Sequence, residues 1–288
     1  MPKKVIIVGS GNAALSAGIA ALEKGAMVTI YEKADNKMAG GNTKYTAGAM
    51  RFAYDNGDQL KELLKNPNDQ RIEKTDFGSY SEEKFKSDLL NFNDGRPLSS
   101  EQKILVSKSL ETIQWLSSHN VKFEPIFSRQ SFLKDGKHVF WGGLTLAAEN
   151  EGVGLFEQEL SAFISLGGKI YYNSAIKKLI YDDERVKGVV LNNKKIESDS
   201  VILASGGFEA NEELRKLYIG DQWVKAKVRG TPNNTGDGLK MALEIGAVKH
   251  GLYDGCHATP MDLHMKDFGG LDLEPSERKN YRKICYFL

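Results

Sequence analysis

The sequence predicts a Rossmann-like α/β fold, in which a parallel central sheet is accompanied by a small antiparallel meander and a helical insertion. Three observations support this prediction: a complete strand, helix and strand unit at residues 3–33, a second apolar strand at 201–204 that also ends in glycines, and helical periodicity at 56–124. We expect one main domain over residues 1–250 and a segment of different character over 251–288.

The first strand, turn and helix have the pattern that binds the phosphates of a dinucleotide. Residues 5–8 form a continuous apolar run, as in a parallel strand buried on both faces. Gly9 permits a tight turn, Gly11 lets the backbone approach a pyrophosphate, and Ala14 keeps helix and strand close. Gly18 extends the spacing to GxGxxAxxxG. The helix would direct its free N–H groups and the positive end of its dipole at the phosphates.

Glu32 ends the second strand of this unit, 21 residues after Gly11. A carboxylate at this position accepts hydrogen bonds from ribose hydroxyls and repels a 2′-phosphate. The unit therefore predicts an adenine dinucleotide without a 2′-phosphate, although glycine turns also precede helices in purely structural units. By itself, the unit does not separate FAD from NAD.

Length and composition limit the class of protein. The 288 residues are enough for one large domain or two smaller ones. The 39 Lys and Arg residues balance 38 Asp and Glu residues, so no overall charge indicates a nucleic acid or an acidic membrane as partner. The 29 glycines gather in short turns rather than in repeats, which excludes a collagen-like chain.

The cysteines and the apolar segments favour a reducing, aqueous compartment. Cys256 and Cys285 form no CxxC pair, which argues against a disulfide framework and against a metal knuckle. No charged leader precedes the first strand, and no apolar run reaches the roughly 18 residues of a membrane-spanning helix. We therefore expect a cytoplasmic protein without direct membrane insertion.

A loop after the first unit combines two adjacent glycines with small and hydroxyl-bearing side chains. Such a loop could lie along a planar ring, or it could be an ordinary polar loop, and composition does not decide between the two. The residues concerned are Gly40, Gly41, Asn42, Thr43, Thr46 and Gly48.

Residues 56–124 are predicted to form helices with a solvated polar surface. Leu60, Leu63 and Leu64 suit one short helix, and 85–92 suits another. Ser99 or Ser100 can cap a longer helix that continues to residue 116. Trp115 is expected in the core of this region rather than against a cofactor. We assign no chemistry to these helices.

The stretch 125–150 carries two features with structural alternatives. Trp141 precedes two glycines, which could form a pocket wall or a hairpin turn with a packed indole. His138 has no carboxylate near it in sequence, so we expect it at the surface rather than in a catalytic role.

The chain then returns to the sheet. A helix is expected over 154–168, a strand over 169–172, and a three-stranded meander over 176–198. The apolar strand 201–204 ends in Ser205, Gly206 and Gly207. Because ligands of open α/β sheets bind beyond the carboxyl ends of the strands, this turn is predicted to meet the same dinucleotide, with a purely structural turn as the alternative.

Two further stretches contain candidate polar residues. Thr235–Gly238 opens an amphipathic helix, where Asp237 can stabilise the amino end through the helix dipole by about 0.3–1 kcal/mol. His257 and His264 lie seven residues apart in a region without a clear regular element, and Pro260 argues against a helix there. No zinc site is predicted, and the adjacent Cys256 is not assigned as a nucleophile.

Several motifs resemble the FAD-dependent tricarballylate dehydrogenase branch of the fumarate reductase and succinate dehydrogenase flavoprotein superfamily, over essentially the whole chain. They are GGNTKYTAGAM with the following RxAYD, TDFGSYSEEKF, FWGGLT, ASGGFEAN, KVRGTPNNTGDG and GCHA. The resemblance implies that residues 1–250 are an FAD-binding domain and that 251–288 begin a capping domain. It also implies hydride transfer between flavin N5 and a carbon–carbon bond of a di- or tricarboxylate, tricarballylate-like or fumarate/succinate-like.

The resemblance also assigns roles to residues. A noncovalent FAD is implied, because relatives with covalent flavin carry a histidine in the loop at 40–51, whereas no histidine precedes His119. His257 aligns with a histidine that binds the substrate carboxylate, and Ala175 and Ile176 are expected against the adenine. The full set expected at the cofactor is Gly9, Gly11, Asn12, Ala13, Ala14, Glu32, Lys33, Gly40, Gly41, Asn42, Thr43, Thr46, Ala47, Gly48, Ala175, Ile176, Ala204, Ser205, Gly206, Gly207, Thr235, Gly236 and Asp237.

One departure from the family pattern concerns the end of the chain. In that family the proton-transfer arginine and a return into the flavin domain follow the start of the cap, whereas here the sequence ends at RKICYFL. We therefore expect either an FAD oxidoreductase acting on a polycarboxylate or a truncated, noncatalytic nucleotide-binding fragment. A separate chain that supplies the missing carboxyl-terminal half is an expected partner. The electron acceptor and the oligomeric state are not predicted.

Overall fold

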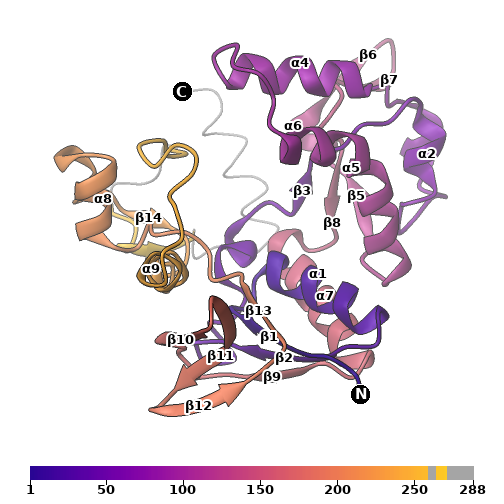
Figure 1. The fold of residues 1–288 in the computed structure, drawn as a ribbon. Helices are drawn as coiled ribbons and strands as arrows, with labels where there is room; N and C mark the ends of the chain where they lie inside the picture. Colours follow the sequence, from indigo (N-terminus) through magenta and orange to yellow (C-terminus); the bar gives the residue numbers. More distant parts are fainter. Residues whose placement is uncertain (259–263, 271–288) are drawn as a thin grey trace. The chain divides into compact units, whose positions relative to one another are not determined.

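The computed structural model describes residues 1–258 and 264–270. These residues divide into two compact units (Figure 1). Unit 1 comprises Met1–Tyr45 together with the described residues from Glu159 onward, and unit 2 comprises Thr46–Gln158. The predicted boundary at residue 250 stays a prediction, and most of the proposed cap, including Cys285, lies outside the described residues.

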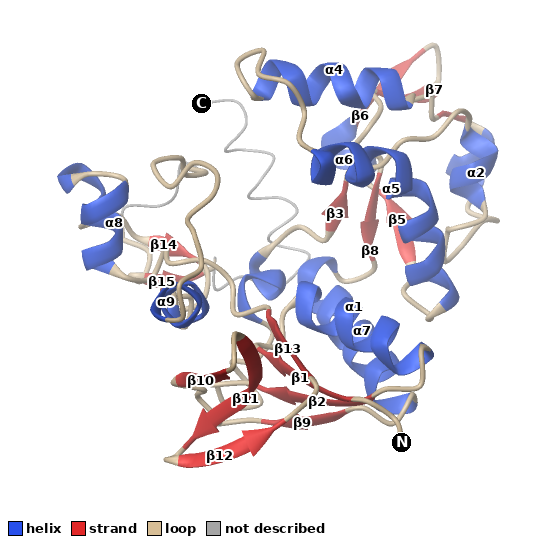
Figure 2. Cartoon of the chain, in the orientation of Figure 1, coloured by secondary structure: helices blue, strands red, loops and turns tan. Residues whose placement is uncertain are grey.

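Unit 1 is built on a parallel sheet with the strand order β13-β1-β2-β9 (Figure 2). Its strands are Lys4–Val8 (β1), Met27–Tyr31 (β2), Lys169–Tyr171 (β9) and Ser200–Leu203 (β13). Val8 pairs with Tyr31 on one side and with Leu203 on the other. The chain therefore adds strands on both sides of β1, so the carboxyl ends of β1 and β13 form a topological switch point, where open sheets bind ligands.

Alternating side chains of β1 pack on the two faces of this sheet. Ile7 lies in the layer of α1 (Asn12–Glu23) and the second half of α7 (Glu151–Ser165), where a Cβ on Gly18 would lie 2.7 Å from the ring of Phe163. Ile6 and Val8 lie in a second apolar cluster on the opposite face. That cluster is completed by Tyr31, Ile176, Leu179, Val189 and Met241.

The second face is covered by the predicted antiparallel meander. Its strands are Lys178–Asp182 (β10), Arg185–Leu191 (β11) and Lys194–Glu197 (β12). The remaining elements of unit 1 are η1 (Gly41–Tyr45), α8 (Glu212–Tyr218), η2 (Asp221–Trp223), β14 (Val228–Arg229), α9 (Asp237–Glu244) and β15 (Phe268–Gly269). The short strand β15 pairs with β14 and was not predicted from the sequence.

Unit 2 contains the predicted helical insertion together with short strands within it and on either side of it. Its helices are α2 (Gly57–Lys61), α3 (Gln70–Glu73), α4 (Glu82–Phe92), α5 (Ser100–Ser118), α6 (Phe127–Gln130) and the first half of α7. Its strands are β3 (Ala49–Met50), β4 (Thr75–Asp76), β5 (Phe123–Pro125), β6 (Ser131–Lys134), β7 (Lys137–Phe140) and β8 (Leu146–Ala148). Ser99 rather than Ser100 caps α5, through a complete capping box with Gln102.

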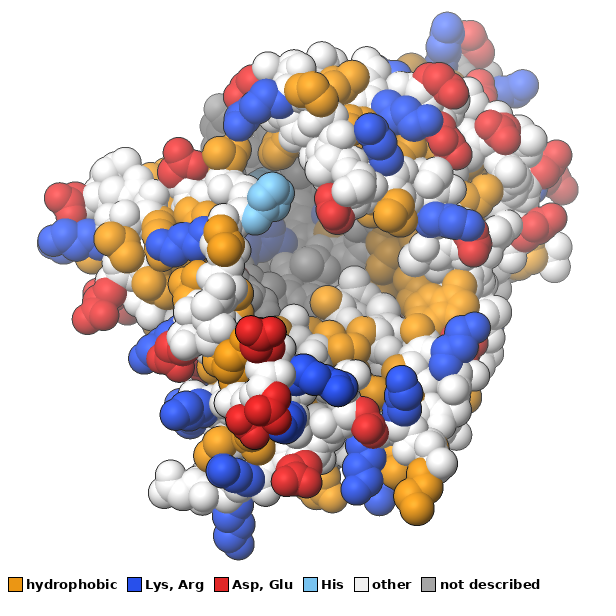
Figure 3. Space-filling model, in the orientation of Figure 1, with side chains coloured by type: hydrophobic (Ala, Val, Ile, Leu, Met, Phe, Trp, Pro, Cys, Tyr) orange, Lys and Arg blue, Asp and Glu red, His pale blue; other side chains and the backbone are white. Residues whose placement is uncertain are grey.

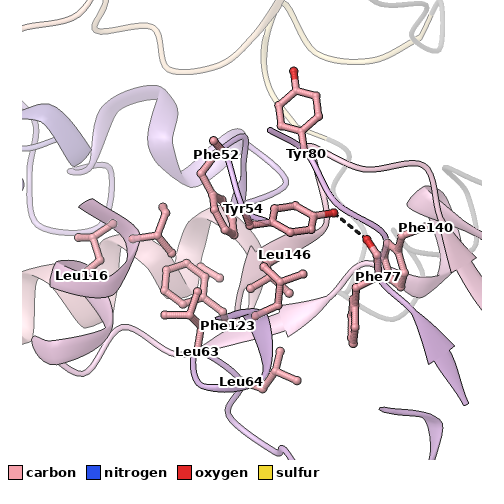
Figure 4. Packing of buried hydrophobic residues seen from close by; sticks show 14 of the residues in the cluster. Phe52, Tyr54, Leu63, Leu64, Phe77, Tyr80, Leu116, Phe123, Phe140 and Leu146 are labelled. Carbon is pink, nitrogen blue, oxygen red and sulfur yellow. Dashed lines mark hydrogen bonds between the residues drawn. The ribbon is translucent and has the colours of Figure 1, made fainter. Parts of the chain in front are cut away.

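The core of unit 2 is rich in aromatic side chains (Figure 4). Phe52, Tyr54 and Phe123 are almost fully buried, and Trp115 packs against the same cluster from a partly buried position. The hydroxyl of Tyr54 donates to the carbonyl of Phe77 at 2.8 Å, which satisfies its buried polar group. A separate core of this kind explains why unit 2 is compact by itself.

On the face drawn in Figure 3, basic and acidic side chains are interspersed, so neither sign of charge dominates this face. His138 is half-buried rather than fully at the surface, because its ring packs on Phe127 and its Nδ1 lies 3.3 Å from Ser131 Oγ. No helix within the described ranges combines the length and the hydropathy needed to cross a bilayer.

Candidate functional site: a pocket at the switch point of the sheet

A pocket of about 380 Å³ lies within unit 1, at the carboxyl ends of β1, β2 and β13. Its volume falls in the range of small-molecule sites. Fifteen of the predicted cofactor residues line it: Gly9, Gly11, Asn12, Ala13, Glu32, Lys33, Gly41, Asn42, Thr43, Ala175, Ile176, Ala204, Ser205, Gly206 and Asp237. The structure thus brings together five stretches that are distant in sequence: 9–33, 41–43, 175–176, 204–206 and residue 237.

The glycine turn after β1 has no room for side chains. Gly9 has φ +101°, and a Cβ at this position would lie 2.5 Å from the carbonyl oxygen of Ala204. Gly11 precedes α1 as its cap residue and has no side chain to cover the helix end. The backbone N–H of Asn12 donates to Thr43 Oγ1 at 2.9 Å, which ties the turn to η1. The backbone and the amino end of α1 are therefore presented to the pocket.

Glu32 is buried at the pocket wall and held by two donors. Its Oε2 accepts from the hydroxyl of Ser10 at 2.7 Å, and its Oε1 accepts from the backbone N–H of Ala34, also at 2.7 Å. Ser10 Oγ in turn accepts from the N–H of Gly40 at 3.0 Å. Gly40 itself does not line the pocket. Through Ser10, it connects the second loop to the carboxylate predicted at the ribose.

Lys33 and Asp237 form a half-buried ion pair on another wall of the pocket. Lys33 Nζ lies 2.9 Å from Asp237 Oδ2 and also donates to Thr235 Oγ1 at 2.7 Å. Burial opposes ionisation of Asp237, but the hydrogen bond and the charge of Lys33 outweigh it, so the pKa of Asp237 is lowered. The predicted TGDG turn is therefore fixed to the end of β2, although Thr235 and Gly236 lie behind the lining.

Glu209 joins two further walls through a single oxygen. Its Oε1 accepts from the side-chain amide of Asn234 at 2.7 Å and from that of Asn42. The other end of the Asn42 amide accepts from the N–H of Thr231 at 2.9 Å. Both asparagines line the pocket, whereas Glu209 stands behind them. The bridge thus connects η1 to the segments after β13 and β14.

Other predicted residues lie outside the lining. Ala14 is fully buried between α1 and the sheet, which is the packing role expected of it. Gly207 follows the lining residue Gly206. Thr46, Ala47 and Gly48 belong to unit 2, where a Cβ on Gly48 would lie 2.6 Å from the backbone of Glu151. His257 is exposed and does not line the pocket.

Several residues at the site were not predicted from the sequence. Ser10, Thr231 and Asn234 contribute polar atoms to the lining. Behind the lining, Glu209 accepts from the Asn234 amide, and Glu159 accepts from Ser16 on α1. The motif NNTGDG contains Asn234 and could have identified it as a site residue. The sequence indicates Glu159 less strongly, as a charged residue on the apolar face of α7 between Phe156 and Phe163.

The lining fits a dinucleotide: a glycine turn closed to side chains, an uncovered helix amino terminus and a buried carboxylate at the end of the next strand. Fold and site together define the chain as a dinucleotide-binding α/β protein. The chain belongs to the FAD-binding domain family, whose model matches residues 4–254. This membership confirms the predicted fold class and FAD as the cofactor.

Similar proteins include fumarate reductases and other reductases. The chain is 29% identical over 264 residues to the fumarate reductase (cytochrome) of Shewanella frigidimarina, which covers 88% of this chain and 42% of that protein. It is 24% identical over 287 residues to the vinyl phenol reductase of Lactiplantibacillus plantarum, covering 95% of this chain and 50% of that one. The chain thus spans about half or less of the length of these relatives.

Solved structures agree with the fold. The open conformation of a flavocytochrome c3 fumarate reductase matches with a TM-score of 0.63 and 26% identity, over 86% of this chain and 41% of that one. The 3-ketosteroid Δ1-dehydrogenase from Sterolibacterium denitrificans matches with a TM-score of 0.66 at 17% identity, over 85% of this chain and 55% of that one. The second likeness shows the fold alone.

Proposed function

We propose that the protein is an FAD-dependent oxidoreductase that transfers hydride between the flavin and a carbon–carbon bond of a small di- or tricarboxylate. The observation that carries the proposal is the pocket at the switch point, whose walls come from five stretches expected around an FAD. The similarity to fumarate reductases supports a dicarboxylate, and the sequence motifs favour a tricarballylate-like substrate. FAD, when bound, supplies the hydride-accepting and hydride-donating centre.

The residues of this chain would hold and orient the cofactor. The N–H groups at the start of α1 would bind the pyrophosphate, and Glu32 would accept hydrogen bonds from ribose. Ala175 and Ile176 would lie against the adenine through their backbone. The noncovalent attachment rests on the loop at 40–51, which contains no histidine.

His257 is proposed to bind a substrate carboxylate. It is exposed, so a carboxylate could reach it, and an imidazolium would attract a negatively charged substrate. It lies beyond the family match, which ends at residue 254. The proton-transfer arginine, the electron acceptor and the rest of the substrate site are not assigned to any residue. The predicted cytoplasmic location likewise stays a prediction.

Anaerobic spectroscopy tests the proposal directly. The FAD-loaded chain would be mixed with tricarballylate, with succinate, and, after photoreduction, with fumarate. Loss of the oxidised flavin band with a saturated carboxylate, or its return with an unsaturated one, is expected. A chain that binds FAD but shows neither change with any carboxylate would refute carboxylate chemistry for these 288 residues and would leave the noncatalytic nucleotide-binding alternative.

A further inference from the structure

Three sequence motifs that the proposed cofactor site does not use meet at one arginine of unit 2. Arg51 belongs to the motif RxAYD, Tyr80 to TDFGSYSEEKF and Gly143 to FWGGLT. Arg51 Nη1 donates to the hydroxyl of Tyr80 at 3.0 Å. A Cβ on Gly143 would lie 2.5 Å from the same nitrogen. The guanidinium therefore occupies the space that a side chain at Gly143 would need.

The backbone around Arg51 is held by the core of unit 2. Phe52, the next residue, is almost fully buried, and its N–H donates to the carbonyl of Gly143 at 3.4 Å. Tyr54 and Tyr80 exchange two backbone hydrogen bonds of 2.9 and 2.8 Å. Tyr80 is also buried, and in Figure 4 its side chain points away from those of Phe52 and Tyr54. A side chain on such a support is oriented before a ligand binds.

The hydroxyl of Tyr80 connects Arg51 to an acidic side chain. It donates to Asp88 Oδ2 at 2.7 Å, and burial raises the pKa of Tyr80, which keeps the phenol protonated. Lys84 Nζ lies 2.9 Å from Asp88 Oδ1, and its hydrogen bond lowers the pKa of this carboxyl group. Arg51 Nη1 is 3.9 Å from Asp88 Oδ2, which is beyond hydrogen-bond distance. Two cations therefore share one carboxylate, and the three side chains together keep a positive charge.

Most donors of Arg51 are left for a ligand. A guanidinium carries five N–H donors, and the hydrogen bond to Tyr80 uses Nη1. Within residues 1–258 and 264–270, Nε and Nη2 donate to no acceptor, and 42% of the side chain is exposed. The planar fork of a guanidinium matches the two oxygens of a carboxylate. The arrangement therefore fits a carboxylate group.

We propose that Arg51 binds one carboxylate of the di- or tricarboxylate substrate, with Tyr80 and Gly143 fixing the guanidinium in place. This inference rests on the proposed function and extends it by naming a residue for substrate specificity. Arg51 follows Gly48 by three residues, so their Cα atoms are at most about 11 Å apart. Because Gly48 belongs to the loop expected at the flavin, a carboxylate on Arg51 stays near the proposed hydride-transfer centre. A second carboxylate of the same substrate remains for His257.

Anaerobic calorimetric titration of the FAD-loaded chain with tricarballylate, and separately with fumarate, tests the proposal. Arg51→Gln removes both the charge and the fork, so the dissociation constant is expected to rise about 10- to 100-fold. Arg51→Lys keeps a point charge without the fork and should lose less. Arg96→Gln serves as the matched control and should bind like the wild type. Arg96 is also exposed and lies 3.7 Å from Asp94, but it belongs to none of the motifs.

Asp88→Asn separates a ligand-binding arginine from a purely structural one. The new amide can still accept from Tyr80, but the negative charge near Arg51 is removed. Carboxylate binding is therefore expected to tighten about threefold. If Arg51 served only to neutralise Asp88, this variant would leave the affinity for tricarballylate unchanged, and the proposal would fail.

The outcomes separate this inference from the proposed function. Every variant is expected to bind FAD like the wild type, because neither Arg51 nor Asp88 lines the pocket of unit 1. Arg51→Gln that binds tricarballylate as tightly as Arg96→Gln would overturn the role of Arg51 alone. A loss of FAD affinity in Arg51→Gln would do the same, since the arginine would then serve the cofactor. Wild type that binds FAD but neither carboxylate would overturn both proposals.

Discussion

At the residue scale, the site depends on side chains whose partners are fixed by burial. Glu32 illustrates this: two donors satisfy its oxygens before any ligand arrives, so the carboxyl group is oriented in advance. Glu159 illustrates the opposite case, because burial without a cation keeps it neutral. Two buried carboxyl groups of unit 1 are therefore held differently, Glu32 by two hydrogen-bond donors and Glu159 by burial with Ser16 as its donor.

The neutral state of Glu159 predicts a pH dependence of stability. Its pKa is raised in the folded chain, from 4.5 to about 8. Between these values the folded state binds more protons than the unfolded state. The contribution of Glu159 to the free energy of unfolding is therefore fully present below pH 4.5 and is lost as pH rises through about 8. The slope from this group is at most about 1.4 kcal/mol per pH unit.

Denaturant unfolding at several pH values, in wild type and Glu159→Gln, measures this effect. The advantage of the variant over the wild type is expected to grow between about pH 5 and about pH 8 and then to level off. Titrations common to both chains cancel in the difference. A difference that stays constant with pH would show that Glu159 is ionised in the folded chain.

At the scale of elements, the pocket is held by connections between loops rather than by the strands themselves. Glu209 connects η1 with the segment before α9 through Asn42 and Asn234. The amide groups of both asparagines lose this acceptor if the carboxylate is removed.

Glu209→Ala is therefore expected to weaken FAD binding by about tenfold or more, because the two lining amides lose their common anchor. Glu209→Gln retains an oxygen acceptor and should lose less. The matched control Glu213→Ala alters an exposed carboxylate on α8 and should bind like the wild type. Equal affinities for Glu209→Ala and this control, measured by flavin fluorescence, would contradict the anchoring role.

The hairpin between β10 and β11 contains strained residues that allow a test of the meander. Asp183 and Glu184 have φ values of +48° and +59°, a conformation that costs non-glycine residues roughly 1–2 kcal/mol. Glu184→Gly is expected to raise the free energy of unfolding by about 1 kcal/mol. In the next hairpin, Asn193 has φ +62°, and Asn193→Gly should gain less, because asparagine tolerates this conformation. Thermal unfolding of both variants measures the two changes in the free energy of unfolding. If Glu184→Gly is destabilised, or gains no more than Asn193→Gly, the positive φ of Glu184 does not strain the turn.

At the scale of the whole molecule, the parts predictable from the sequence are those with local signals. The unit β1-α1-β2 follows from an apolar run, glycine spacing and an acidic residue within about thirty residues, and the meander follows from alternation. The pairing of β14 with β15 joins residues 228 and 268, and two-residue strands leave no periodicity to detect.

The supporting residues of the site were missed for a related physical reason. The oxygen of Glu209 meets amides 167 and 25 residues away, and Glu159 meets Ser16 across 143 residues. No local sequence pattern predicts such contacts. By contrast, a position where a Cβ would collide with a carbonyl oxygen, such as Gly9, is visible in the sequence as a glycine. The separation of unit 2 as a compact unit also depends on long-range packing, which brings residues 46–55 and 125–158 together with the helices.

The central claim is that this chain holds FAD in the pocket at the end of β1. Equilibrium titration of the purified 288-residue chain with FAD, followed by flavin fluorescence and by absorbance after gel filtration, tests it most directly. The account predicts saturable binding of one noncovalent FAD, released on denaturation. A colourless protein that cannot be loaded with FAD, or a flavin that stays attached after denaturation, would contradict it.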